Sequence, residues 1–160
     1  MFSFRKRGDQ AEVHRLIRRL IDMSCPSLHL TRGESRWEDR SNRTLPVLLV
    51  PLSKDGPVAE EAAYAVTKNL SGQGLALVLP QPFWAEGVVI GLWNESEPEF
   101  VRGEIRQNVP LGGGFWQLGI ELLERLPLAT GPQLAPLVPL AARLDPKTES
   151  DEHLALTDSP

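Results

Sequence analysis

Short apolar runs separated by turn-forming residues occupy the middle of this chain. Successive runs start about 10–15 residues apart, with glycine, proline or polar residues between them. Apolar and polar residues alternate most clearly over residues 101–106 and 116–122, a period of two that is typical of strands with one buried face. The pattern therefore predicts antiparallel β structure. The predicted strands begin near Leu45, Glu60, Gly74, Ala85, Glu99 and Gly114.

Six strands of this kind predict an all-β core in the form of a small closed antiparallel β-barrel. Closure removes the exposed strand edges that would otherwise invite aggregation. A barrel of eight or fewer strands has an interior that side chains fill, so it leaves no room for a ligand inside. We therefore expect any ligand to bind on the outer wall. The glycine run at 112–114 lacks the lysine and helix of a phosphate-binding loop, and it is interpreted as a hairpin turn.

Composition narrows the classes of partner. The chain has 160 residues, which fits one modest domain with tails, and its net charge of −4 provides no general attraction to nucleic acid or anionic lipid. Any anion-binding site must therefore be formed by a few basic residues that lie close together. Cys25 is the single cysteine, which excludes an internal disulfide and a cysteine-based zinc site. No apolar run is long enough for a membrane span, so we expect a cytoplasmic protein that does not act at membranes.

The segments outside the barrel are predicted as follows. Residues 1–31 contain an amphipathic helix over 9–23 and a connector, 32–127 the barrel, 128–144 a proline-rich segment with a short helix, and 145–160 a disordered acidic tail. The helix stripe packs either on the barrel or on a second copy of the chain, which would give a homodimer. The stripe consists of Val13, Leu16, Ile17, Leu20 and Ile21.

Two motifs about thirty residues apart carry the functional prediction. Arg36 and Arg40 stand four residues apart before the first strand, and Asn69, Ser71 and Gly74 lie where the strand beginning near Gly74 starts. A guanidinium group donates a planar fork of hydrogen bonds to phosphate and stacks on flat rings. Short polar side chains add hydrogen bonds, and glycine allows close approach of a ligand. Together the motifs predict an anion-binding pocket.

Three further residues are candidate ligand contacts. Trp37 either stacks on a base or anchors the loop against the barrel, while Arg32 and Arg43 either contact phosphate or hold the loop. Arg32 also permits a second register with Arg36. The two carboxylates at positions 38 and 39 would repel an anion unless they point away or pair with Arg32 or Arg43.

These motifs resemble the signature of the PilZ family, small β-barrel domains that bind the bacterial second messenger cyclic di-GMP. That signature is an Arg-x-x-x-Arg loop before the first strand and an Asp/Asn-x-Ser-x-x-Gly segment at the end of the second. Residues 43–50 resemble the family's first strand, 67–79 the signature hairpin and 118–122 the last strand. The resemblance covers residues 32–125 and implies a PilZ-like six-stranded barrel.

The resemblance also implies a function. The arginine loop would wrap cyclic di-GMP, through Arg36, Arg40, Asn69, Ser71 and Gly74, and change the face offered to an unidentified protein effector. An alternative is a degenerate PilZ-like barrel that binds no nucleotide and serves as a protein-interaction module. We expect no enzyme, because no histidine lies in the predicted strands, and we expect no cofactor or metal site. Few aromatic residues and the negative net charge disfavour a nucleic-acid-binding barrel.

Overall fold

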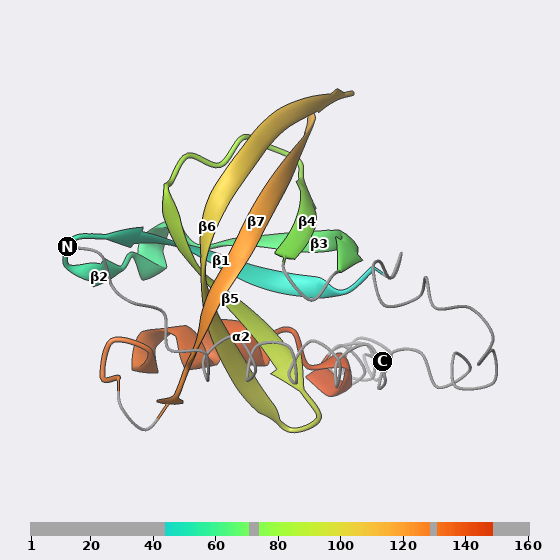
Figure 1. Cartoon of the computed structure of the whole chain (residues 1–160). Helices are drawn as coiled ribbons and strands as arrows, with labels where there is room; N and C mark the ends of the chain where they lie inside the picture. The colour runs from blue at the N-terminus through green and yellow to red at the C-terminus, as the bar shows by residue number, and fades with distance from the viewer. Residues whose placement is uncertain (1–43, 71–73, 129–130, 149–160) are drawn as a thin grey trace, which may run out of the picture.

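The computed structural model describes residues 44–70, 74–128 and 131–148, and its core is a closed antiparallel barrel (Figure 1). The hydrogen-bonded order is β1-β3-β4-β7-β6-β5, and β5 pairs back with β1 to close the wall. A two-residue strand, β2, pairs with the end of β1. The predicted six-stranded barrel is confirmed. Its strands are β1 (Pro46–Ser53), β3 (Ala63–Leu70), β4 (Gly74–Leu79), β5 (Gly87–Asn94), β6 (Glu97–Gly112) and β7 (Phe115–Leu126), with β2 at Gly56–Pro57.

The strands start close to the predicted positions, with one informative difference. The run that begins near Glu60 first forms a 3₁₀ turn, η2 (Ala59–Glu61), and β3 starts only at Ala63. Glu60 and Glu61 are exposed on this turn. The carboxylates therefore stay in water before the chain enters the wall, and β3 is shorter than the pattern suggested.

Branched aliphatic side chains fill the barrel interior. Strand β4 shows the rule plainly, because Leu75, Leu77 and Leu79 are buried and alternate with more exposed neighbours. Phe83, from the loop between β4 and β5, adds a ring to the same cluster. Side chains thus occupy the interior, as the sequence predicted for a barrel of this size.

A second apolar cluster lies outside the barrel, between its wall and the C-terminal segment. This segment contains η4 (Ala135–Leu137) and the short helix α2 (Val138–Ala142), which lies beside the barrel in Figure 1. The predicted short C-terminal helix is confirmed. The Tyr64 hydroxyl on β3 also donates a 2.9 Å hydrogen bond to the Leu140 carbonyl. The buried members of this cluster are Leu48, Val50, Val89, Phe100, Leu134, Leu137, Ala141 and Leu144.

Strands β6 and β7 continue beyond their neighbours as a projecting hairpin arm (Figure 1). Pairing of β5 with β6 reaches only Glu104, and the arm ends in glycines 112, 113 and 114. Their φ angles are 90°, 63° and 86°, a left-handed region that glycine adopts without strain. The predicted hairpin turn is therefore confirmed.

The predicted N-terminal helix and connector lie outside the described residues. The predicted disordered tail begins inside them, where residues 146–148 are helical and the Asp145 carboxylate accepts a hydrogen bond from the Lys147 backbone N–H. Within the described ranges, no helix is both long and apolar enough to cross a bilayer.

The covering of the barrel by the C-terminal segment gives a stability prediction. Leu137 is fully buried, so Leu137→Ala should lower the free energy of unfolding by about 2–5 kcal/mol through lost contacts and a residual cavity. Leu128→Ala is the matched control, because Leu128 is 41% exposed and its truncation should cost little. Urea unfolding followed by tryptophan fluorescence measures both. Equal stability of the two variants would contradict the packing of this segment on the wall.

Candidate functional site

The described residues include part of the predicted site. Asn69 lies near the end of β3, and Gly74 is the first residue of β4. They therefore stand on the two sides of one hairpin. The other predicted site residues lie outside the described residues, and they are Arg32, Arg36, Trp37, Arg40, Arg43 and Ser71.

The start of the barrel is fixed to this hairpin by Thr67. The backbone N–H of Leu45 donates a 2.8 Å hydrogen bond to the Thr67 hydroxyl, and the Thr67 N–H donates to the Leu45 carbonyl at 2.9 Å. Thr67 is 1% exposed, so both bonds are shielded from water. The chain that follows the arginine motif is therefore attached to β3 at Thr67, two residues before Asn69. Sequence analysis missed this role, although a threonine among the apolar residues of β3 was a signal for it.

A β-bulge at Lys68 turns Asn69 toward the outer wall. Thr67 pairs with Leu77, but Asn69 pairs with Ala76, so Lys68 is an extra residue on β3. Leu77 points into the barrel and is fully buried, which places the neighbouring Ala76 on the outside. Because directly paired residues share a face, Asn69 also faces outward. Without the bulge, strict alternation from Thr67 would have turned the Asn69 side chain inward.

Small residues line the outer wall beside Asn69. Ala76 on β4 pairs with Gly119 on β7, and Gly74 pairs with Glu121. A Cβ atom at Gly74 would overlap the carbonyl oxygen of Ile120, so glycine is needed here for close packing of β4 on β7. This requirement accounts for Gly74 independently of any ligand. The outward residues beside Asn69 are thus Ala76 and Gly119, and the side chain of Gln107 lies against Gly119.

The arginines of the barrel wall are already paired with carboxylates. Arg106 bonds to Glu104 at 2.8 Å and to Glu121 at 2.6 Å. Its hydrogen bond to Glu121, and then the charges of Glu121 and Glu104, raise the pKa of Arg106 above its ordinary value. Arg102 pairs with Glu124 at 2.8 Å. Two arginines here face three glutamates, so this outer surface on β6 and β7 is net negative and is not an anion site.

The barrel end that holds Leu45 also contains buried polar groups. Glu99 is 5% exposed and accepts two 2.8 Å hydrogen bonds from the guanidinium of Arg125. Asn94, the last residue of β5, is 4% exposed, and its Oδ1 has no hydrogen-bond partner among the described residues.

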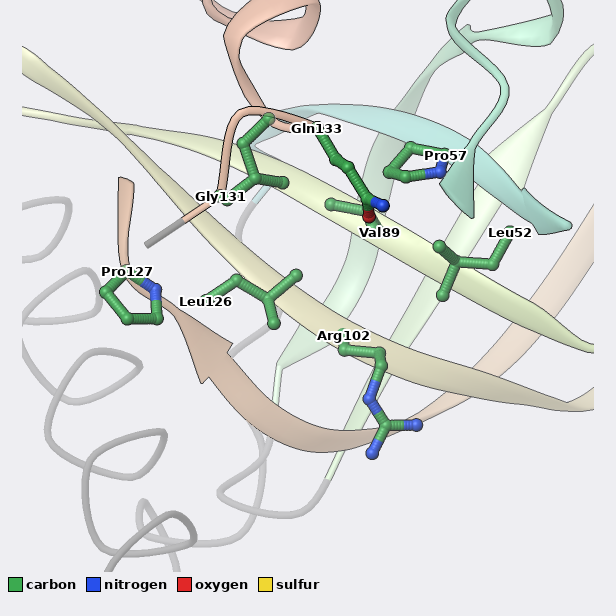
Figure 2. A pocket seen from close by; sticks show the side chains of 9 residues that line it. Leu52, Pro57, Val89, Arg102, Leu126, Pro127, Gly131 and Gln133 are labelled. Carbon is green, nitrogen blue, oxygen red and sulfur yellow. The ribbon is translucent and has the colours of Figure 1, made fainter. Parts of the chain in front are cut away.

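A separate pocket of about 240 Å³ lies between the wall and the C-terminal segment (Figure 2). Its lining is mostly apolar, including Leu52, Val89 and Leu126, and Gln133 reaches in from the C-terminal segment. Arg102 lines one side, but its Nε is bound to Glu124. We assign no function to this pocket. Within the described ranges, no group of histidine, cysteine, aspartate and glutamate side chains is placed to hold a metal ion.

Comparison with solved structures gives a weak likeness in fold. No family model matches the chain, and no curated protein matches it. A solved structure, the inhibitor of motility MotI/DgrA of Bacillus subtilis, is similar with 20% sequence identity and a TM-score of 0.43. The match covers 69% of this chain and 51% of that one, so the chain spans about half the length of its neighbour. A likeness at this level carries no functional assignment.

The attachment of Leu45 to Thr67 gives a second stability prediction. Thr67→Val removes the acceptor of a shielded N–H, so the free energy of unfolding should fall by about 1–3 kcal/mol. Thr67→Ser is the matched control, because it retains the hydroxyl and should lose less stability. Urea unfolding of both variants measures the difference, and a valine variant as stable as the serine variant would contradict the role assigned to the hydroxyl.

Proposed function

We propose that this protein binds cyclic di-GMP on the outer wall of its barrel, at the hairpin of β3 and β4, and relays binding to a protein partner. The observation that supports the proposal most directly is the attachment of Leu45 to Thr67. It joins the arginine-bearing segment to the barrel beside Asn69. Two motifs that are about thirty residues apart in sequence are therefore tethered to one end of one hairpin.

Chain length limits how far the arginines can stand from the hairpin. Arg40 is four residues before Thr44, and Arg36 is eight residues before it. An extended chain advances at most about 3.6 Å per residue, so the Cα of Arg40 stays within about 14 Å of Thr44 and that of Arg36 within about 29 Å. A long arginine side chain can cover much of the first distance. Both guanidinium groups are thus within reach of a ligand that touches Asn69.

The chemistry of the ligand suits this wall. Cyclic di-GMP has two phosphates, which match arginine forks, and two flat guanine bases, which stack on guanidinium planes. A base would lie against Ala76 on β4, which is on the same outer face of the barrel as the Asn69 side chain. Because the wall arginines of β6 and β7 are paired with glutamates, the arginine motif is expected to provide most of the charge.

A second candidate function is supported by the hairpin arm. Leu111 and Phe115 near its tip are 46% and 50% exposed, and Trp84 from the adjoining loop is 75% exposed. No charged residue occurs between Arg106 and Glu121. Exposed apolar surface of this kind marks interaction sites. The barrel would then serve as a protein-interaction module, with or without the nucleotide.

Isothermal titration with cyclic di-GMP tests the first proposal, with guanosine triphosphate as the ligand control. Arg36→Ala/Arg40→Ala should weaken binding at least about a hundredfold, because each charge-assisted contact contributes about 1.5–3 kcal/mol. Lys54→Ala/Arg143→Ala is the charge-matched control, since both residues are exposed and distant from the hairpin in sequence. It should bind as the wild type does. If millimolar cyclic di-GMP gives no heat and no thermal shift, nucleotide binding is rejected. The second candidate function, a protein-interaction module, then remains.

Asn69 gives a finer prediction for the same site. Asn69→Ala should weaken cyclic di-GMP binding by about 2–12-fold, the range that corresponds to one hydrogen bond of about 0.5–1.5 kcal/mol. Its side chain faces the outer wall, so the free energy of unfolding should change little. Titration and urea unfolding of the same preparation separate the two effects. Unchanged affinity would remove Asn69 from the site without affecting the arginines.

A further inference from the structure

Lys68 differs from the other basic residues of the barrel wall. The described strands of the barrel carry four basic side chains, and Arg102, Arg106 and Arg125 are each paired with glutamate. The ammonium group of Lys68 instead contacts the neutral Oε1 of Gln117, at 3.0 Å. Among these strands, Lys68 is therefore the basic residue without a carboxylate partner in the described part of the chain.

The position of Lys68 follows from the bulge. It is the extra residue of β3, it is exposed, and it directly precedes Asn69. Gln117 lies on β7, and β4 runs between β3 and β7, so the lysine side chain spans the outer face of β4. Ala76 is the neighbouring outward residue of β4, and it pairs with Gly119. Gln117 pairs with Val78, so the ammonium group is held on the outer wall beside Val78, two residues along β4 from Ala76.

We infer that Lys68 is an anion-binding residue, which contacts a phosphate of the nucleotide from the barrel side. The inference rests on the proposed function and adds a residue that neither motif contains. A lysine ammonium has three N–H donors. Gln117 occupies one, so two remain for phosphate oxygens. The nearby carboxylate of Glu121 is bound to Arg106, which reduces its repulsion of an incoming phosphate.

Two separate parts of the chain would then neutralise the phosphate charge of the ligand. The arginine motif belongs to a segment that joins the barrel at Thr44, whereas Lys68 is part of the hydrogen-bonded wall. A cation on the wall is already placed when the ligand arrives, and its side chain is oriented by Gln117. Lys68 would therefore contribute to affinity even when the arginine motif is removed.

Titration with cyclic di-GMP at two salt concentrations tests the inference. Lys68→Gln should weaken binding about tenfold or more, since a hydrogen bond to a charged group contributes at least about 1.5 kcal/mol. Its affinity should also depend less on salt than that of the wild type, because one attractive charge is lost. Lys68→Arg retains the charge and should bind within a few-fold of the wild type. Lys54→Gln is the control, because Lys54 is an exposed lysine in the turn after β1.

The outcomes separate this inference from the proposed function. If the wild type binds and Lys68→Gln binds equally well with the same salt dependence, the role of Lys68 is overturned while cyclic di-GMP binding stands. If the wild type does not bind, the proposed function fails and the inference fails with it. Weaker binding of Lys68→Gln than of Lys54→Gln, with rescue by arginine, supports the inference. Circular dichroism of each variant verifies that the exposed substitution leaves the fold intact.

Discussion

Strand β1 pairs along both edges and is buried on both faces, and the rest of the structure is built on that constraint. It pairs with β3 on one side and with β5 on the other, which closes the barrel. Val47 and Leu49 face the interior, while Leu48 and Val50 face the C-terminal segment. A strand buried on both faces needs apolar residues at successive positions, so β1 shows no alternation. The same strand begins at the residue after Leu45, which Thr67 holds against β3.

The sequence predicted the barrel well where one face of a strand is solvated. Alternation over residues 101–106 identified β6, because Val101 is buried while Arg102 lies on the outer wall. The bulge at Lys68 was missed, since a bulge depends on the pairing of two strands and leaves no mark in the periodicity of one. The second apolar cluster was also missed. Its C-terminal residues occur among prolines, where neither period is sustained.

For the candidate site, the sequence identified the residue types but not the strand pairing and hydrogen bonds that position them. The motif containing Asn69 indicated a turn with polar side chains, yet the outward orientation of Asn69 comes from the pairing with Ala76. Gly74 was interpreted through a ligand, and the structure adds a need for glycine against the Ile120 carbonyl. Thr67 and Lys68 belong to neither motif. Their roles depend on contacts with Leu45 and Gln117, both of which are more than twenty residues away in sequence.

Charge pairing bears on where the proposed anion site of this acidic chain would lie. With a net charge of −4, basic residues that are paired with glutamates contribute little attraction for a phosphate. The exposed ion pairs on β6 and β7 also add little stability, since such pairs contribute about 0–1 kcal/mol each. Their main consequence is that the two paired arginines, which face three glutamates, offer no net positive charge to an anion. Attraction for an anion is then concentrated at Lys68 and, on the proposed function, at the arginine segment attached beside it. A packed and closed barrel resists deformation, so the response to a ligand would arise in that attached segment rather than in the wall.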